Sequence, residues 1–133
     1  MKIDGACHCG NIAFEAEVDP ETVRICHCTD CQTFSGSLFR ANVQASAETF
    51  RLVRGTPKIY IKTADSGTKR AQAFCTDCGT GLWATSPVNP TSYGLRVGTI
   101  TQRATFRPTH QIWCLSELPW TSQVGAVERR DRA

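Results

Sequence analysis

The sequence has no apolar run that approaches the roughly eighteen residues of a membrane-spanning helix, so we expect no membrane contact. Its first residues, Met1 to Gly5, carry no apolar segment of the kind that directs secretion, and this favours a cytoplasmic location. No segment repeats along the chain, and none is of low complexity. With an ordinary hydrophobic content of 41%, these absences favour one globular domain over residues 1–133.

A convincing helical pattern is also missing, because no stretch repeats its apolar residues with the 3.6-residue period of a helix. Short segments instead alternate apolar and polar residues, and in the clearest of them, 58–63, Ile59 and Ile61 share one face. Turn residues such as Asp65 to Thr68 separate these segments. Their spacing predicts a small antiparallel all-β domain with short strands, and the charged end of the chain, 125–133, predicts a frayed tail.

Two further strands are predicted near the C-terminus, over residues 93–100 and 108–115. Cys114 lies in the second of these, and we expect it to be a buried, small hydrophobic residue. Trp83 and Trp120 are expected in the core, because large aromatic side chains are most often buried.

Cysteine, in contrast, is abundant: the chain has eight, and seven of them fall into three tight clusters. The first is a C-x-C pair, the second a C-x-C-x2-C triplet and the third a C-x2-C pair. They comprise Cys7 and Cys9; Cys26, Cys28 and Cys31; and Cys75 and Cys78. Cysteines scattered through a core would not group in this way, whereas turns that aim thiolates at one point would.

The number of cysteines in each cluster suggests two kinds of zinc site. A structural zinc is closed by four protein ligands, and the two pairs together supply four thiolates. The triplet supplies only three, and a zinc with three protein ligands keeps the open position that is typical of a catalytic site. We therefore predict two zinc ions per chain, one structural and one reactive, the latter free to take a thiol as its thiolate.

Three other uses of the cysteines stay open, namely disulfides, a single four-thiolate zinc site and an iron–sulfur cluster. His8 and His27 each stand between the two cysteines of a C-x-C, where the middle side chain points away from the two sulfurs. We expect neither histidine to bind metal, and His27 as a proton shuttle is the alternative.

The charged residues do not suggest a macromolecular partner. The 15 Lys and Arg residues outnumber the 12 Asp and Glu residues, but they are spread along the chain, so we expect no nucleic-acid partner. Two Zn²⁺ bound by seven thiolates would bring the net charge of +3 to about 0. Arg40, Arg51, Lys62 and Arg96 could meet the carboxylates of a ligand, although solvated strand faces explain these four side chains equally well.

The order of the motifs carries a family resemblance. The motifs are Gly5-x-Cys7-x-Cys9-Gly10, Cys26-His27-Cys28-x2-Cys31 with Ser35-Gly36 behind it, Phe74-Cys75-x2-Cys78-Gly79, and a late Leu118-Pro119-Trp120. Over nearly its whole length the sequence resembles the glutathione-dependent formaldehyde-activating enzyme family, which includes centromere protein V. It departs from that family after Cys31, where Gln32 and Thr33 stand in place of the basic residue that many members carry.

The resemblance implies a fold, a set of ligands and an activity. The fold would be the small antiparallel assembly called a β-tent. The structural zinc would be held by Cys7, Cys9, Cys75 and Cys78, and the catalytic zinc by Cys26, Cys28 and Cys31. The activity would be that of a carbon–sulfur lyase, S-(hydroxymethyl)glutathione synthase, acting on glutathione or a similar thiol and on a small aldehyde such as formaldehyde. A non-catalytic zinc-stabilised binding module and a thiol-based redox or zinc sensor are the alternatives.

Overall fold

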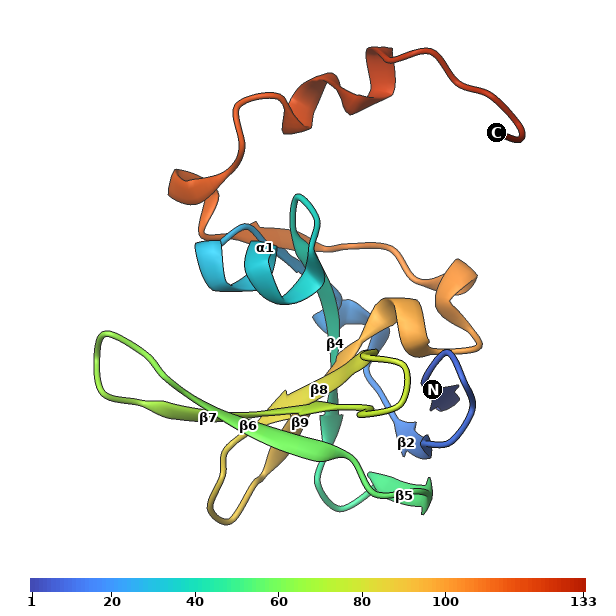
Figure 1. Cartoon of the computed structure of the whole chain (residues 1–133), viewed down its shortest axis with the longest axis vertical. Coiled ribbons are helices and arrows are strands. Elements are labelled where there is room, and N and C mark those ends of the chain that lie inside the picture. Colours follow the sequence, from blue (N-terminus) through green and yellow to red (C-terminus); the bar gives the residue numbers. More distant parts are fainter.

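The strands of the computed structural model, which describes residues 1–133, form two sheets (Figure 1). The smaller sheet has the strand order β1 (Lys2–Ala6), β2 (Ala13–Glu17) and β5 (Arg51–Arg54). The larger sheet has the order β10 (His110–Ile112), β3 (Arg24–Cys26), β4 (Arg40–Ser46), β9 (Ser92–Arg96), β8 (Gly81–Thr85), β7 (Lys69–Phe74) and β6 (Lys58–Thr63). The connections contain one α-helix, α1 (Thr29–Ser35), and the 3-10 segments η1 (Pro20–Thr22), η2 (Val97–Thr99), η3 (Arg103–Thr105), η4 (Cys114–Ser116) and η5 (Thr121–Ala126).

The strand pairing confirms an all-β domain built from short strands. All the pairings between strands are antiparallel except that of β10 with β3, which is parallel. A parallel pair needs a long crossover, and β10 returns to β3 only after the chain has passed through all the other strands of the larger sheet. The predicted turn at Asp65 to Thr68 joins β6 to β7.

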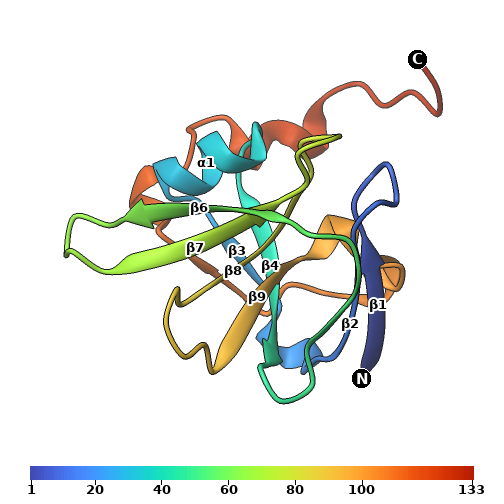
Figure 2. The ribbon, with the colours of Figure 1, turned by 60° about the horizontal axis from the view of Figure 1, so that its bottom comes forward.

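The hydrophobic core lies between the two sheets. Val43 pairs with Leu95, Leu95 with Trp83, and Trp83 with Ala73. Residues that pair directly across strands share a face of the sheet, so these four side chains form one apolar surface of the larger sheet. Phe14 from β2 packs against it, with its ring centroid 5.7 Å from that of Trp83. The larger sheet therefore has an apolar core face and, opposite it, a second face on which α1 lies (Figure 2).

We expect Leu82→Ala to lower the free energy of unfolding by about 2–5 kcal/mol, because it leaves a cavity in this core. Leu82 is fully buried and belongs to the core cluster. Leu115 is the matched control, since its side chain is fully exposed and Leu115→Ala should change stability by less than about 0.5 kcal/mol. Urea denaturation of both variants with zinc in excess measures the difference. Equal losses would show that the core is not where the burial pattern places it.

Helix α1 is the element that the sequence pattern did not predict. It has seven residues, about two turns, and only Cys31 among them is buried. So short a helix cannot repeat an apolar stripe, and the 3.6-residue period is therefore absent from the sequence. Neither α1 nor any 3-10 segment has the length and apolar character that a membrane-spanning helix needs. The cytoplasmic location stays a prediction.

The C-terminal predictions were partly wrong. The strand predicted over 93–100 ends at Arg96, and the one predicted over 108–115 is only His110–Ile112, because β10 pairs with the three residues of β3 alone. Cys114 follows that short strand and is exposed, not buried. Trp83 lies in the core as expected, but Trp120 is 51% exposed, because the chain beyond β10 leaves the body of the molecule (Figure 1).

Candidate metal centres and an adjoining pocket

Four of the clustered cysteines come together from two turns. Cys7 and Cys9 lie between β1 and β2, and Cys75 and Cys78 lie between β7 and β8. The four sulfur atoms lie within 4.8 Å of one another, with 3.6 Å between those of Cys7 and Cys9 and 3.8 Å between those of Cys9 and Cys75. Zn–S bonds of about 2.3 Å at tetrahedral angles place sulfurs about 3.8 Å apart. The donor set therefore fits a tetrahedral metal ion such as zinc.

Local backbone geometry aims these thiols at one point. Gly10 and Gly79, which follow the two pairs, have φ values of 79° and 73°, a conformation that glycine adopts at little cost. The N–H of Ile12 donates to the sulfur of Cys7, with 3.3 Å between the two atoms. The two turns also bind each other, because the N–H of His8 donates to the hydroxyl of Thr80.

The other three clustered cysteines meet where β3 passes into α1. Cys26 ends β3, Cys28 is the N-cap of α1, and Cys31 lies in the first helical turn. Their sulfurs lie within 4.8 Å of one another, and the sulfur of Cys28 accepts a hydrogen bond from the N–H of Cys31. Cys26 and Cys31 are buried, whereas Cys28 is half-buried. The cluster could hold a metal ion through three ligands and has one partly exposed member.

The thiols of this cluster differ in acidity. Burial raises the pKa of Cys31 to about 12, although the positive charge of Arg40 opposes the rise. Burial also opposes ionisation of Cys28, but the hydrogen bonds from the N–H of Cys31 and from the thiols of Cys31 and Cys26, together with the charge of Lys62, outweigh it and lower the pKa of Cys28. All eight cysteines of the chain are free of disulfide bonds. When thiols lie this close, the negative charge of one thiolate disfavours formation of the next. A bound cation would relieve that repulsion.

Neither histidine of the C-x-C motifs belongs to a sulfur cluster. His8 is exposed, whereas His27 is fully buried, and its Nε2 lies 2.7 Å from the side-chain oxygen of Gln111. A proton shuttle must exchange protons with solvent or substrate, and a buried ring with no place in the pocket wall does neither.

Gln32 donates its amide hydrogens to the backbone oxygens of His27 and Ser116 and so ties α1 to the C-terminal segment.

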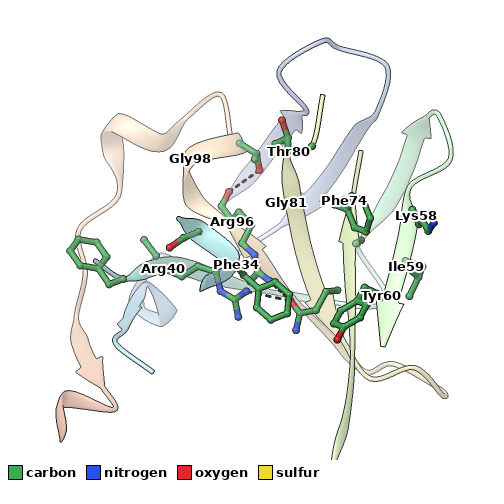
Figure 3. Close-up of a pocket in the computed structure, with 17 residues that line it drawn as sticks. Phe34, Arg40, Lys58, Ile59, Tyr60, Phe74, Thr80, Gly81, Arg96 and Gly98 are labelled. Atoms are coloured by element: carbon green, nitrogen blue, oxygen red, sulfur yellow. Dashed lines mark hydrogen bonds between the residues drawn. The ribbon is translucent and has the colours of Figure 1, made fainter. Parts of the chain in front are cut away.

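A pocket of about 880 Å³ is lined by residues of α1 and of the larger sheet (Figure 3). Phe34 and Ser35 of α1 form one wall, Arg40 and Arg96 stand on the sheet, and Gly79 to Gly81 lie at the end near the four-cysteine cluster. The cysteines themselves do not line it. Arg40 lies next to the three-cysteine cluster, because it pairs directly with Cys26 across β3 and β4.

The structure distinguishes among the four basic residues whose role in ligand binding the sequence left open. Arg40 and Arg96 line the pocket, whereas Lys62 forms an ion pair with Asp30 of α1, and Arg51 is exposed on the smaller sheet. Burial and the neighbouring charge of Arg40 lower the pKa of Arg96 to about 9. No sequence signal could have distinguished these residues, because strand register decides which of them meet.

Comparison with known proteins places the chain in a family. Residues 2–116 match the family described as glutathione-dependent formaldehyde-activating enzyme, and all seven clustered cysteines fall inside that range. The fold also resembles the crystal structure of a protein from Rhodobacter sphaeroides, with a TM-score of 0.62 and 24% sequence identity over 81% of this chain and 98% of that chain. The structural likeness supports the fold alone. Because the family match covers far more than half of its length, this chain belongs to the glutathione-dependent formaldehyde-activating enzyme family.

Proposed function

We propose that this protein is a zinc-dependent carbon–sulfur lyase, similar to S-(hydroxymethyl)glutathione synthase, that adds a thiol such as glutathione to formaldehyde or another small electrophile. The observation that carries this proposal is the division of the seven thiols. Four of them come together from two turns that are hydrogen-bonded to each other. The other three lie next to a pocket large enough for a small molecule. Family membership supports the same chemistry.

The two clusters would have separate roles. In this proposal Cys7, Cys9, Cys75 and Cys78 hold a structural zinc, and Cys26, Cys28 and Cys31 hold a catalytic zinc. A zinc at the second cluster would lower the pKa of a thiol and polarise a carbonyl group. Three thiolates would leave that site with a net charge of −1, which weakens Lewis acidity and favours thiol chemistry over hydrolysis. The half-buried Cys28 marks the side from which a ligand can reach the cluster.

Calorimetric titration of the zinc-loaded protein with reduced glutathione tests the proposal, with S-methylglutathione as the control. We expect reduced glutathione to bind and S-methylglutathione to bind at least about tenfold more weakly, because only a free thiol can bind zinc as a thiolate. Equal binding of the two would contradict the proposed role of the thiol. If neither compound binds, glutathione is not the substrate, and the alternative that the protein is a zinc-stabilised binding module is favoured.

A further inference from the structure

Four arginines gather on the face of the larger sheet that lies opposite the core. Asn42 on β4 pairs with Arg24 on one side and with Arg96 on the other, so the three side chains share this face. Arg40 stands two residues before Asn42 and therefore points the same way. On β7 the same face carries Gln72 and, two residues before it, Arg70, because Gln72 pairs through Ala84 with Gly94.

Two of these arginines are held together by a neutral group. The side-chain oxygen of Gln72 accepts a hydrogen bond from Arg96 at 2.7 Å and another from Arg40 at 3.3 Å. Arg96 also donates to the side-chain oxygen of Asn42. Gln72 and Asn42 are both buried, so this arrangement is built into the wall of the pocket. The Nε of Arg40 is buried and has no hydrogen-bond partner, which leaves one donor of this pair of guanidinium groups unused.

No carboxylate of the protein balances this positive charge. The ion pairs of the chain are Lys62 with Asp30 and Arg130 with Glu128, and none of the four arginines takes part in either. A zinc-loaded three-cysteine cluster would carry one negative charge, which balances only one of them. Buried or half-buried guanidinium groups without a counter-ion are costly, and an anionic ligand would remove that cost.

One part of the pocket lining is apolar and aromatic, alongside polar residues such as Lys58 and Thr80. The ring of Phe34 lies 6.1 Å from that of Tyr60, and the guanidinium carbon of Arg40 lies 5.4 Å from the centroid of the Phe34 ring. Ile59 and Phe74 also line the pocket. Figure 3 shows Phe34, Tyr60 and Arg40 directed toward the same part of the pocket. A ligand here would meet guanidinium groups and aromatic rings next to each other.

We propose that this pocket binds a carboxylate-bearing small molecule, with the carboxylate on Arg40 and Arg96 and an apolar portion against Phe34 and Tyr60. This assigns a substrate class to the catalytic site and rests on the function proposed above. A carboxylate binds two guanidinium groups through charge-assisted hydrogen bonds.

The test is titration of the zinc-loaded protein with 3-phenylpropanoate and with 3-phenylpropanamide, which has the same shape and no charge. We expect the carboxylate to bind at least about tenfold more tightly than the amide. Gln72→Glu should weaken binding of the carboxylate by about tenfold or more, because it places a carboxylate of the protein between the two guanidinium groups. Arg40→Gln should have a similar effect through loss of one charge.

The matched control is Arg51→Gln, which removes an exposed charge from the smaller sheet and should leave the affinity unchanged. Zinc content and the melting temperature show that each variant is folded. If Arg40→Gln does not fold, Gln72→Glu still tests the proposal, because it leaves all four arginines in place. Equal affinity for the carboxylate and the amide, binding of neither, or unchanged affinity in Gln72→Glu would overturn the proposal.

Glutathione itself has two carboxylates and separates this proposal from the previous one. Weaker glutathione binding in Gln72→Glu would mean that one of its carboxylates occupies the subsite. Binding of 3-phenylpropanoate without any binding of glutathione would remove the proposed thiol substrate and keep the subsite, whose occupant would then be another carboxylic acid.

Discussion

We expect Cys75→Ser to lose one of the two proposed zinc ions and to leave the chain largely unfolded at room temperature. Cys75 is buried, and its sulfur lies 3.8 Å from that of Cys9, which is 66 residues away along the chain. A metal at this cluster would therefore hold β1 and β2 against β7 and β8. Zinc bound by four thiolates contributes about 10–16 kcal/mol to folding, comparable to or larger than the net stability of about 5–15 kcal/mol of a typical domain.

Zinc content by mass spectrometry, together with far-ultraviolet circular dichroism, measures this result. Cys114→Ser is the control, because Cys114 is exposed and belongs to neither cluster, so this variant should keep two zinc ions and its fold. A folded Cys75→Ser protein with two zinc ions would show that the four-cysteine cluster is not a structural metal site.

We expect Cys28→Ser to lose the other zinc ion, to keep its fold and to lose thiol-addition activity by about a hundredfold or more. The loss of activity follows because the metal would supply several kcal/mol of charge stabilisation to the reaction. The fold should survive because Cys28 is the N-cap of α1 and its side chain accepts a hydrogen bond from the N–H of Cys31. Serine is among the best N-cap residues, so Cys28→Ser retains that hydrogen bond while it removes a thiolate.

The readouts are zinc content, circular dichroism and the rate of hemithioacetal formation from formaldehyde and glutathione. Thr33→Ala, an exposed substitution on the same helix, is the matched control and should keep two zinc ions and full activity. Two zinc ions per chain in Cys28→Ser would mean that the ligand assignment of the three-cysteine cluster is wrong. Retained activity with one zinc ion would place the chemistry elsewhere.

The grouping of the cysteines was predictable because each cluster is encoded locally. Spacings of two or three residues around a turn place sulfurs on one side of it, whatever the rest of the chain does. The number of thiols then predicted that the two pairs would combine, and the structure does bring Cys7 and Cys9 to Cys75 and Cys78. Alternation likewise placed Ile59 and Ile61 on one face of β6, although both are exposed, since β6 is an edge strand of the larger sheet.

The sequence by itself thus determined the cysteine clusters, the short antiparallel strands and the family. Only the tertiary structure decided what surrounds the three-cysteine cluster. Arg40 and Arg96 lie on β4 and β9, and both reach Gln72 on β7 only because strand register places them on one face of the larger sheet. Helix α1 closes the pocket over that face through Phe34, whose contacts with Arg40 and Tyr60 join three separate elements. Metal-ligand spacing is a local property of the chain, whereas a pocket depends on register between distant strands, and no short pattern records it.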